Sequence, residues 1–328
     1  MPAPTVRSMT EEIDRTRFEQ LAQRGGDRAL ATSLAASVRG GDLTAAADLA
    51  ALLVHVAMVA PEGLPELYDG ATAGWSGTAP SAAPLLIAQP IENEPLATEF
   101  WHDFWALVLD PDVGRNAGEI TVRTAALAVH TSDAFRTRLA ATTLHYPGVR
   151  EALAAGDPTP FTMAQLAACP KGSLGGDLHD LIVDNNFDLE VLPREQLAFS
   201  SLPVPLGYVN SRILQCHDLW HLLAGYRPTI LQEVAISGFQ LAQFGHHYSS
   251  MFLAVTVTKV ALTSPPALEL MLDTIFSGWA HGRDTPPLLG LPWEDIWHEP
   301  IEAIRAAHGI TPYPSPYPAD LLELLLAG

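Results

Sequence analysis

Apolar positions along the chain recur mainly at intervals of three and four residues, which is the pattern of amphipathic α-helices. Residues 11–60 predict two or three helices separated by glycine pairs, and the last of them ends before Pro61. From about residue 96 the helical pattern returns and continues through most of the chain. Short β-branched patches such as AVTVTKV (254–260) are weak indications of strands. The pattern therefore predicts a mainly α fold, a bundle-like set of helices around a single core.

Residues 61–95 interrupt the helical pattern. This stretch is dense in Pro, Gly, Ala and Ser, a composition typical of a long loop or linker. We therefore predict two parts: an N-terminal helical extension with its linker (1–98) and a helical core (99–328).

The composition is typical of a folded chain, and the net charge excludes some classes of binding partner. Of 328 residues, 48% are hydrophobic and 17% are charged, which is enough apolar material for a sizeable core. Lys and Arg number 18 against 37 Asp and Glu, giving a formal net charge of -19. Because binding to phosphates requires a clustered basic surface, we expect no nucleic-acid partner. Purely electrostatic docking on anionic lipid is disfavoured for the same reason, whereas an apolar membrane contact is not.

Cysteine use and apolar run length indicate the compartment. Cys169 and Cys216 are the two cysteines, too few for a disulfide framework and suited to a reducing environment. The N-terminus has no apolar signal core. The longest apolar run, at 47–60, is shorter than the roughly 18 residues that a spanning helix needs. We expect a cytoplasmic protein without a transmembrane helix, at most bound peripherally to the inner face of the cytoplasmic membrane.

Candidate chemistry is concentrated in HDLWHLLAGYRPTILQE, residues 217–233. On a helix, residues four apart share a face at about 6 Å, so His217 and His221 can direct their imidazoles at one ion. Asp218 lies at the edge of the same face. This is the geometry by which HExxH helices bind zinc.

Glu233 joins this group only if the helix stops. On an uninterrupted helix it would lie about 18 Å from His221 along the axis, far beyond a metal–ligand bond. Gly225 is a natural C-terminal cap, and Pro228 disfavours helix in the residue before it. Thr229 can cap a second helix. Packed back against the first helix, that second helix would return Glu233 to the histidines.

A His/Asp/His/Glu set offers nitrogen and oxygen ligands, which suit Zn(II), Fe(II) or Mn(II). Asp218 is either a ligand or a general base, and the sequence does not choose between these roles. A zinc hydrolase of the HExxH type is one hypothesis, although that class has Glu as the base where this chain has Asp218.

The HDxxH arrangement followed by eleven residues and Glu resembles the metal motif of the ubiquinone (coenzyme Q) biosynthesis protein 4 family. Other segments are similar to that family in the same order, and together they span roughly 100–312. They are FWALVLDPDV (104–113), CPKGSLGGDL (169–178), GYRPTILQEVAISGFQLAQFG (225–245), GWAHGR (278–283) and PWEDIWHEPIEAIRAAHGI (292–310).

The resemblance implies that His217, Asp218, His221 and Glu233 hold one divalent metal, with Zn or Fe(II) ahead of Mn. It implies metal-dependent oxidative decarboxylation, in which hydroxyl replaces the C1 carboxylate of a polyprenyl-hydroxybenzoate, with Asp218 as the candidate catalytic residue. The implied partners are a polyprenylated quinone precursor, other ubiquinone biosynthesis proteins, a membrane surface and a second copy in a homodimer. Apolar residues near 239–255 would line the isoprenoid groove. The alternative is a non-catalytic lipid-binding scaffold of the same pathway.

Overall fold

The structure is a computed structural model that describes residues 14–88, 93–113, 117–156, 160–189 and 202–327. Within these residues it contains helices and no strand; Ser173 and Pro300 form one isolated antiparallel bridge. The predicted mainly α fold is confirmed. Parts of the predicted N-terminal extension, residues 1–13 and 89–92, lie outside the described residues.

The first part of the chain, up to residue 156, forms eight α-helices and two short 3-10 helices in the described residues. These are α2 (Arg15–Arg24), α3 (Arg28–Arg39), α4 (Leu43–Met58), η1 (Pro61–Gly63), α5 (Leu64–Ser76), α6 (Thr98–Val108), α7 (Ala117–Ala126), η2 (Leu127–His130), α8 (Asp133–Thr143) and α9 (Val149–Ala154).

The second part carries the motifs. Its described elements are α10 (Met163–Ala167), α11 (Leu174–Asn185), α12 (Leu206–Ala224), α13 (Ile230–Phe244), α14 (His247–Thr263), η5 (Pro265–Ala267), α15 (Leu268–Asp284), η6 (Trp293–Asp295), α16 (Ile301–His308) and α17 (Leu321–Ala327). The β-branched patch at 254–260 lies inside α14, so it marks a buried helix rather than a strand.

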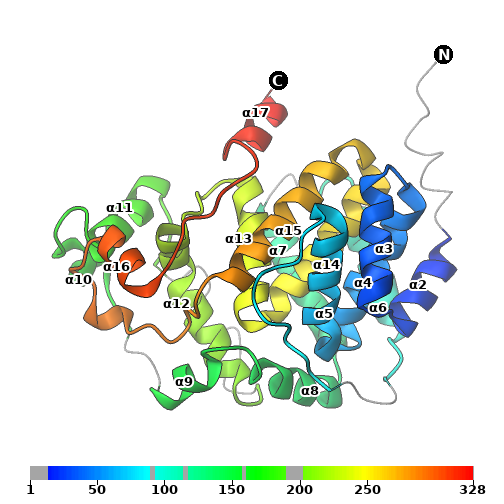
Figure 1. Cartoon of the computed structure of the whole chain (residues 1–328), viewed down its shortest axis with the longest axis horizontal. Helices are drawn as coiled ribbons and strands as arrows, with labels where there is room; N and C mark the ends of the chain where they lie inside the picture. The colour runs from blue at the N-terminus through cyan, green and yellow to red at the C-terminus, as the bar shows by residue number, and fades with distance from the viewer. Residues whose placement is uncertain (1–13, 89–92, 114–116, 157–159, 190–201, 328) are drawn as a thin grey trace.

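Helix α13 contributes to both of the two large apolar clusters, and a third, small cluster contains Phe135, Leu139, Ala140 and Leu206. In α13, Val234 and Leu241 pack with α2–α6, α14 and α15, whereas Ile236 and Phe239 pack with α11 and α12. Figure 1 shows α13 between the N-terminal helices on one side and α10, α11, α12 and α16 on the other. The helix that carries Glu233 is therefore held by packing on two faces.

Glycines allow α13 and α15 to approach closely. A Cβ atom added at Gly278 of α15 would lie 2.2 Å from the carbonyl oxygen of Ala235, and one added at Gly238 of α13 would lie 2.7 Å from the carbonyl oxygen of Ile275. Any side chain at these positions would push the two backbones apart. The small residues thus fix the distance at which α13 packs on its neighbour.

The prediction of a linker over 61–95 is wrong for its first half. Leu64–Ser76 form α5, which buries Tyr68 and Trp75. Its proline lies in the first turn, where the missing N–H group costs nothing. Its glycines serve packing on α3, since a Cβ atom at Gly74 would lie 2.0 Å from the carbonyl oxygen of Thr32. The residues that suggested a loop are those that allow two helices to touch.

The N-terminal helices are joined to α14 and α15 by polar contacts as well as by the shared cluster. Asp69 of α5 accepts hydrogen bonds from the Trp279 indole, at 2.9 Å, and from the Arg283 guanidinium, at 3.3 Å. The imidazole of His247 donates to the carbonyl oxygen of Ala57 in α4, at 2.9 Å. The boundary at residue 98 stays a prediction, but the N-terminal helices and α15 pack directly on one another.

Length and hydropathy identify no single helix, among the described residues, able to cross a membrane. The pair Leu43–Met58 and Pro61–Ser76 passes the same criteria together, with a bend of 119° between its two halves.

We expect residues 99–328 expressed alone to aggregate. Removal of residues 1–98 would expose the apolar faces of α14 and α15, which are buried against the N-terminal helices. Size-exclusion chromatography and circular dichroism of the fragment measure this. A folded, monodisperse fragment would instead support the boundary predicted from the sequence.

The substitution Gly278→Ala should lower the free energy of unfolding by about 1–3 kcal/mol, because the new methyl group would meet the backbone of α13. Gly40→Ala is the matched control. Gly40 has φ of -78° in the right-handed helical region, and an added Cβ atom would lie 3.2 Å from its nearest neighbour. Urea denaturation of the two variants should separate them; equal stabilities would contradict the close contact.

Candidate metal centre

The predicted reversal of the chain after the second histidine is confirmed. Helix α12 ends at Ala224, and Gly225 caps it in the left-handed conformation at φ of 78°. The amide of Tyr226 donates to the carbonyl oxygen of His221, at 2.9 Å. Five residues beyond Gly225, α13 begins at Ile230.

The capping of α13 differs from the expectation in one respect. Thr229 occupies the N-cap position, but its hydroxyl donates to the carbonyl oxygen of Ala319. The carboxylate of Glu323 in α17 accepts the Ile230 amide hydrogen instead, at 2.7 Å. The C-terminal segment thus holds the start of the helix that carries Glu233.

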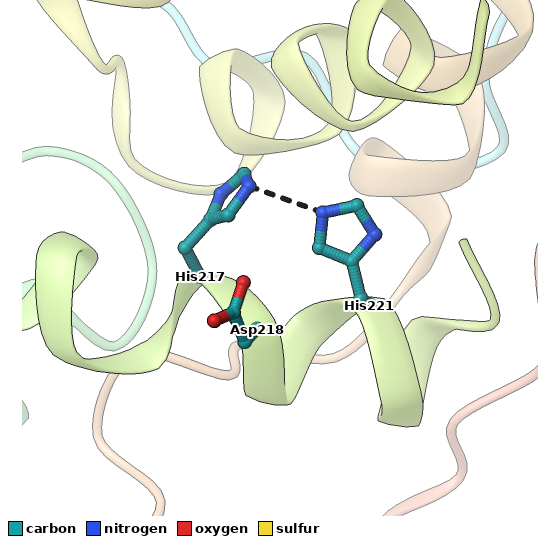
Figure 2. Close-up of side chains that lie close together, drawn as sticks. All are labelled: His217, Asp218 and His221. Carbon is teal, nitrogen blue, oxygen red and sulfur yellow. Dashed lines mark hydrogen bonds between the residues drawn. The ribbon is translucent and has the colours of Figure 1, made fainter. Parts of the chain in front are cut away.

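The reversal brings Glu233 beside both histidines. Its Oε2 lies 3.4 Å from His217 Nε2, and its Oε1 lies 3.2 Å from His221 Nε2. The two imidazole Nε2 atoms are 3.0 Å apart, and Figure 2 shows the rings turned toward one another across one turn of α12. Ligand atoms of His217, Asp218 and His221 all lie within 4.8 Å of one another.

These spacings fit one divalent ion. Ligands bound at about 2.1 Å lie about 3.0 Å apart at right angles and about 3.4 Å apart at tetrahedral angles. The contacts among His217, His221 and Glu233 cover the same range, from 3.0 to 3.4 Å. Two imidazoles and carboxylate oxygens are also the donor set that Zn(II), Fe(II) and Mn(II) accept.

The second ring nitrogen of His221 determines which atom faces the site. His221 Nδ1 lies 3.1 Å from the carbonyl oxygen of Tyr226. A carbonyl oxygen only accepts hydrogen bonds, so Nδ1 carries a hydrogen, and in the neutral ring Nε2 is the atom that can bind a metal ion. Such an outer partner is the usual support of a metal-binding histidine. Tyr226 is itself held, because its hydroxyl bonds His281 Nδ1 at 2.7 Å and its ring stacks on Tyr313.

Sequence reasoning missed Gln240, whose amide nitrogen lies 2.6 Å from His217 Nδ1. Gln240 is buried and follows Glu233 by seven residues on α13. Because seven residues are close to two helical turns, both side chains lie on the face turned toward α12. That spacing was the signal available in the sequence.

The carboxylates and imidazoles of the site shift one another's pKa values. Burial lowers the pKa of His217, but the neighbouring Glu233 and Asp218 carboxylates raise it, and the net pKa is above the usual value. Burial raises the pKa of Glu233, but hydrogen bonds and attraction from the two imidazoles leave it far below the usual range. Glu233 is therefore an anion at neutral pH and can bind a cation.

Exposure differs sharply among the three side chains. That of His221 is 2% exposed, that of His217 27% and that of Glu233 43%. The site is therefore closed behind His221 and open on the Glu233 side. An approaching molecule would meet Glu233 first.

Several other histidines and acidic residues lie in contacts separate from this site. His102 and His130 bond opposite oxygens of Asp103, on the surface formed by α6 and η2. Ser173 caps α11, and Asp177 accepts the Gly172 amide hydrogen, which accounts for the Gly-rich turn near Lys171. Glu294 pairs with the buried Arg212, beside the buried Trp293. Cys216 is buried in the second cluster.

Residues 157–314 match the model of the family described as coenzyme Q (ubiquinone) biosynthesis protein Coq4. That range contains all four candidate ligands. The fold and the site thus define a class of all-α protein in which a helix with the HDxxH motif packs beside a glutamate from the next helix. Residues 157–314 thus resemble the Coq4 domain, which confirms the resemblance expected from the motifs.

Curated relatives agree with this assignment. The ubiquinone biosynthesis protein COQ4 homologs of Bos taurus and Mus musculus are 28% and 27% identical over 160 and 158 residues, respectively. Each alignment covers 46% of this chain, with 56% of the bovine and 55% of the mouse protein. A homolog from Leishmania infantum is 29% identical over 38% of this chain and 68% of its own length. The chain spans about half the length of the mammalian relatives it matches.

A crystal structure of a candidate ubiquinone biosynthesis protein from Nostoc punctiforme is also similar. It is 20% identical, covers 65% of this chain and 97% of its own, and superposes with a TM-score of 0.49.

Alanine at His217, His221 or Glu233 should remove a bound divalent metal, because each change deletes a donor from a cluster spaced for one ion. Elemental analysis of purified protein measures metal per chain, and circular dichroism checks the fold. His102→Ala, at an exposed histidine on another face, is the matched control and should keep the metal. Stoichiometric metal in all three site variants would contradict the assignment.

Proposed function

We propose that this chain takes part in ubiquinone biosynthesis and binds one divalent metal through His217, Asp218, His221 and Glu233. The observation that carries the proposal is the position of Glu233, within 3.4 Å of both imidazoles although it is twelve residues beyond the second. The domain match and the names of the relatives support the pathway.

We propose further that the site replaces the C1 carboxylate of a polyprenyl-hydroxybenzoate by hydroxyl. The carboxylate leaves as CO2, one oxygen atom of O2 becomes the new hydroxyl, and an external two-electron reductant with two protons converts the other oxygen atom to water. A divalent metal supplies a Lewis acid that stabilises negative charge on a carboxylate or phenolate. Zn(II) or Fe(II) ahead of Mn(II) suits the donor set.

The chain's own residues have defined roles in this proposal. His221 is buried and held by the Tyr226 carbonyl, so it fixes the back of the site. Glu233 lies on the open side, where an acidic ring would arrive. Asp218 is next to His217 on the same helix, and its carboxylate serves either as a ligand or as the base that takes the phenol proton.

Partners follow from the same proposal. The substrate would be a polyprenylated quinone precursor, and other ubiquinone biosynthesis proteins would supply and remove it. A polyprenyl tail favours peripheral contact with the inner face of the cytoplasmic membrane through apolar surface, since the chain carries a net charge of -19. A homodimer is the expected assembly of the chain itself.

One observation favours a second candidate function, a lipid-binding scaffold without chemistry. A cavity of about 760 Å³ lies between α5, α15 and the segment 309–316, and its lining contains none of the four candidate ligands. A scaffold could use such a cavity without using the histidines. A measurement of substrate turnover distinguishes the enzyme from the scaffold.

We expect purified, metal-loaded protein to release CO2 from a carboxyl-labelled prenylated hydroxybenzoate in the presence of O2 and a reductant. Asp218→Asn should slow release by about 100-fold or more; retained metal in this variant would assign Asp218 as the base, and lost metal would assign it as a ligand. Glu233→Ala is the control that lacks both metal and turnover. Loaded protein that binds the lipid and releases no CO2 would establish the scaffold function instead.

A further inference from the structure

The buried amide of Gln240 contacts His217 on the side of the ring away from the candidate metal centre. Its nitrogen lies 2.6 Å from Nδ1 of His217, the ring atom opposite the one that faces His221 and Glu233. Gln240 is 3% exposed, so water does not compete for this contact.

Hydrogen bonds through the pair of histidines run in one direction. The carbonyl of Tyr226 accepts from His221 Nδ1, which leaves His221 Nε2 as an acceptor. That acceptor lies 3.0 Å from His217 Nε2 and is satisfied if His217 carries its hydrogen there. His217 Nδ1 is then a bare lone pair, and the Gln240 amide N–H is its donor. The Nε2 hydrogen of His217 is also within reach of Glu233, whose Oε2 lies 3.4 Å away.

Metal binding requires the opposite tautomer of one ring. Both Nε2 atoms must offer lone pairs to the same ion, so neutral His217 must move its hydrogen to Nδ1. The Gln240 N–H group would then face another hydrogen, whereas its carbonyl oxygen would accept one. Rotation of the amide by half a turn exchanges these two atoms with no change in shape.

Resting on the proposed metal centre, we propose that Gln240 is a positioning residue that selects the tautomer of His217. Its amide nitrogen supports the Nε2-protonated ring before metal binds, and its oxygen supports the Nδ1-protonated ring afterwards. An amide can fill both roles because it is donor and acceptor; a carboxylate only accepts, and an aliphatic side chain does neither.

Gln243, three residues along α13, shows how a purely structural glutamine behaves in the same helix. Its amide donates to the carbonyl oxygens of Gly282 and Thr285, at 2.7 and 2.9 Å, and accepts the Leu288 amide hydrogen, at 3.0 Å. Those partners have fixed donor and acceptor roles, so its amide has one orientation. Gln240 faces an imidazole, which can change role.

Nitrogen-15 NMR of the histidine rings in the full-length protein tests the proposal. The spectra distinguish Nδ1-protonated from Nε2-protonated imidazole, before and after addition of Zn(II). For the wild type we expect His217 to change from the Nε2-protonated to the Nδ1-protonated form. In Gln240→Glu, the Nδ1-protonated form should be present before Zn(II) is added.

Zn(II) affinity, measured by competition with a chelator, gives a second result. Gln240→Leu should bind Zn(II) about 10- to 100-fold more weakly, the usual cost of losing an outer partner of a metal-binding histidine. Gln240→Glu should bind at least as tightly as the wild type. His102→Ala, at an exposed histidine on another face, is the control and should change neither the His217 tautomer nor the affinity. If the leucine variant does not fold, the spectra of Gln240→Glu and the wild type decide by themselves.

Two failures are distinguishable. If wild-type protein binds Zn(II) but His217 keeps one tautomer throughout, or Gln240→Glu and the wild type give the same metal-free spectrum, the role of Gln240 is wrong and the metal centre stands. If the wild type binds none of Zn(II), Fe(II) or Mn(II), the metal centre itself is wrong and the role of Gln240 falls with it.

Discussion

The reversal of the backbone between Gly225 and Ile230 is the constraint on which the rest of this molecule depends. It converts a separation of twelve residues into a contact of 3.2 Å between Glu233 and His221. Gly225 adopts a conformation that strains other residues, and an added Cβ atom would also meet Pro312 at 2.9 Å. The amide of Tyr313 donates to the carbonyl oxygen of Ala224, so the C-terminal segment closes over the turn.

That constraint acts on a rigid framework. Helix α13 is packed on one side against α14 and α15 and on the other against α12, and glycines set its distance from α15. A helix fixed on two faces holds its side chains to a narrow range of positions. This is what a metal site requires, because ligand atoms must converge within a few tenths of an ångström.

The packing also shows that the N-terminal helices belong to the same hydrophobic core as α14 and α15. They precede the region that matches the Coq4 family, yet they share one hydrophobic cluster with α14 and α15 and bind Arg283 through Asp69. Substitutions in α4 or α5 would therefore act on α13 through its neighbours, although neither helix contributes a candidate ligand.

Local chemistry along the chain determined the helices, the stop at Gly225 and the three polar residues of the HDxxH turn, because each depends on neighbours within a few residues. The return of Glu233 to the histidines could also be predicted from the sequence. A helix that stops and starts again after a short turn has few ways to pack on the helix before it. Only the tertiary structure decided that α5 is a buried helix, that Glu323 caps α13 and that Gln240 stands behind His217. Those contacts join residues between 23 and 93 positions apart, or depend on the backbone of a second helix that fills the space a glycine leaves. Residue order does not specify such distances; they follow from how apolar faces pack.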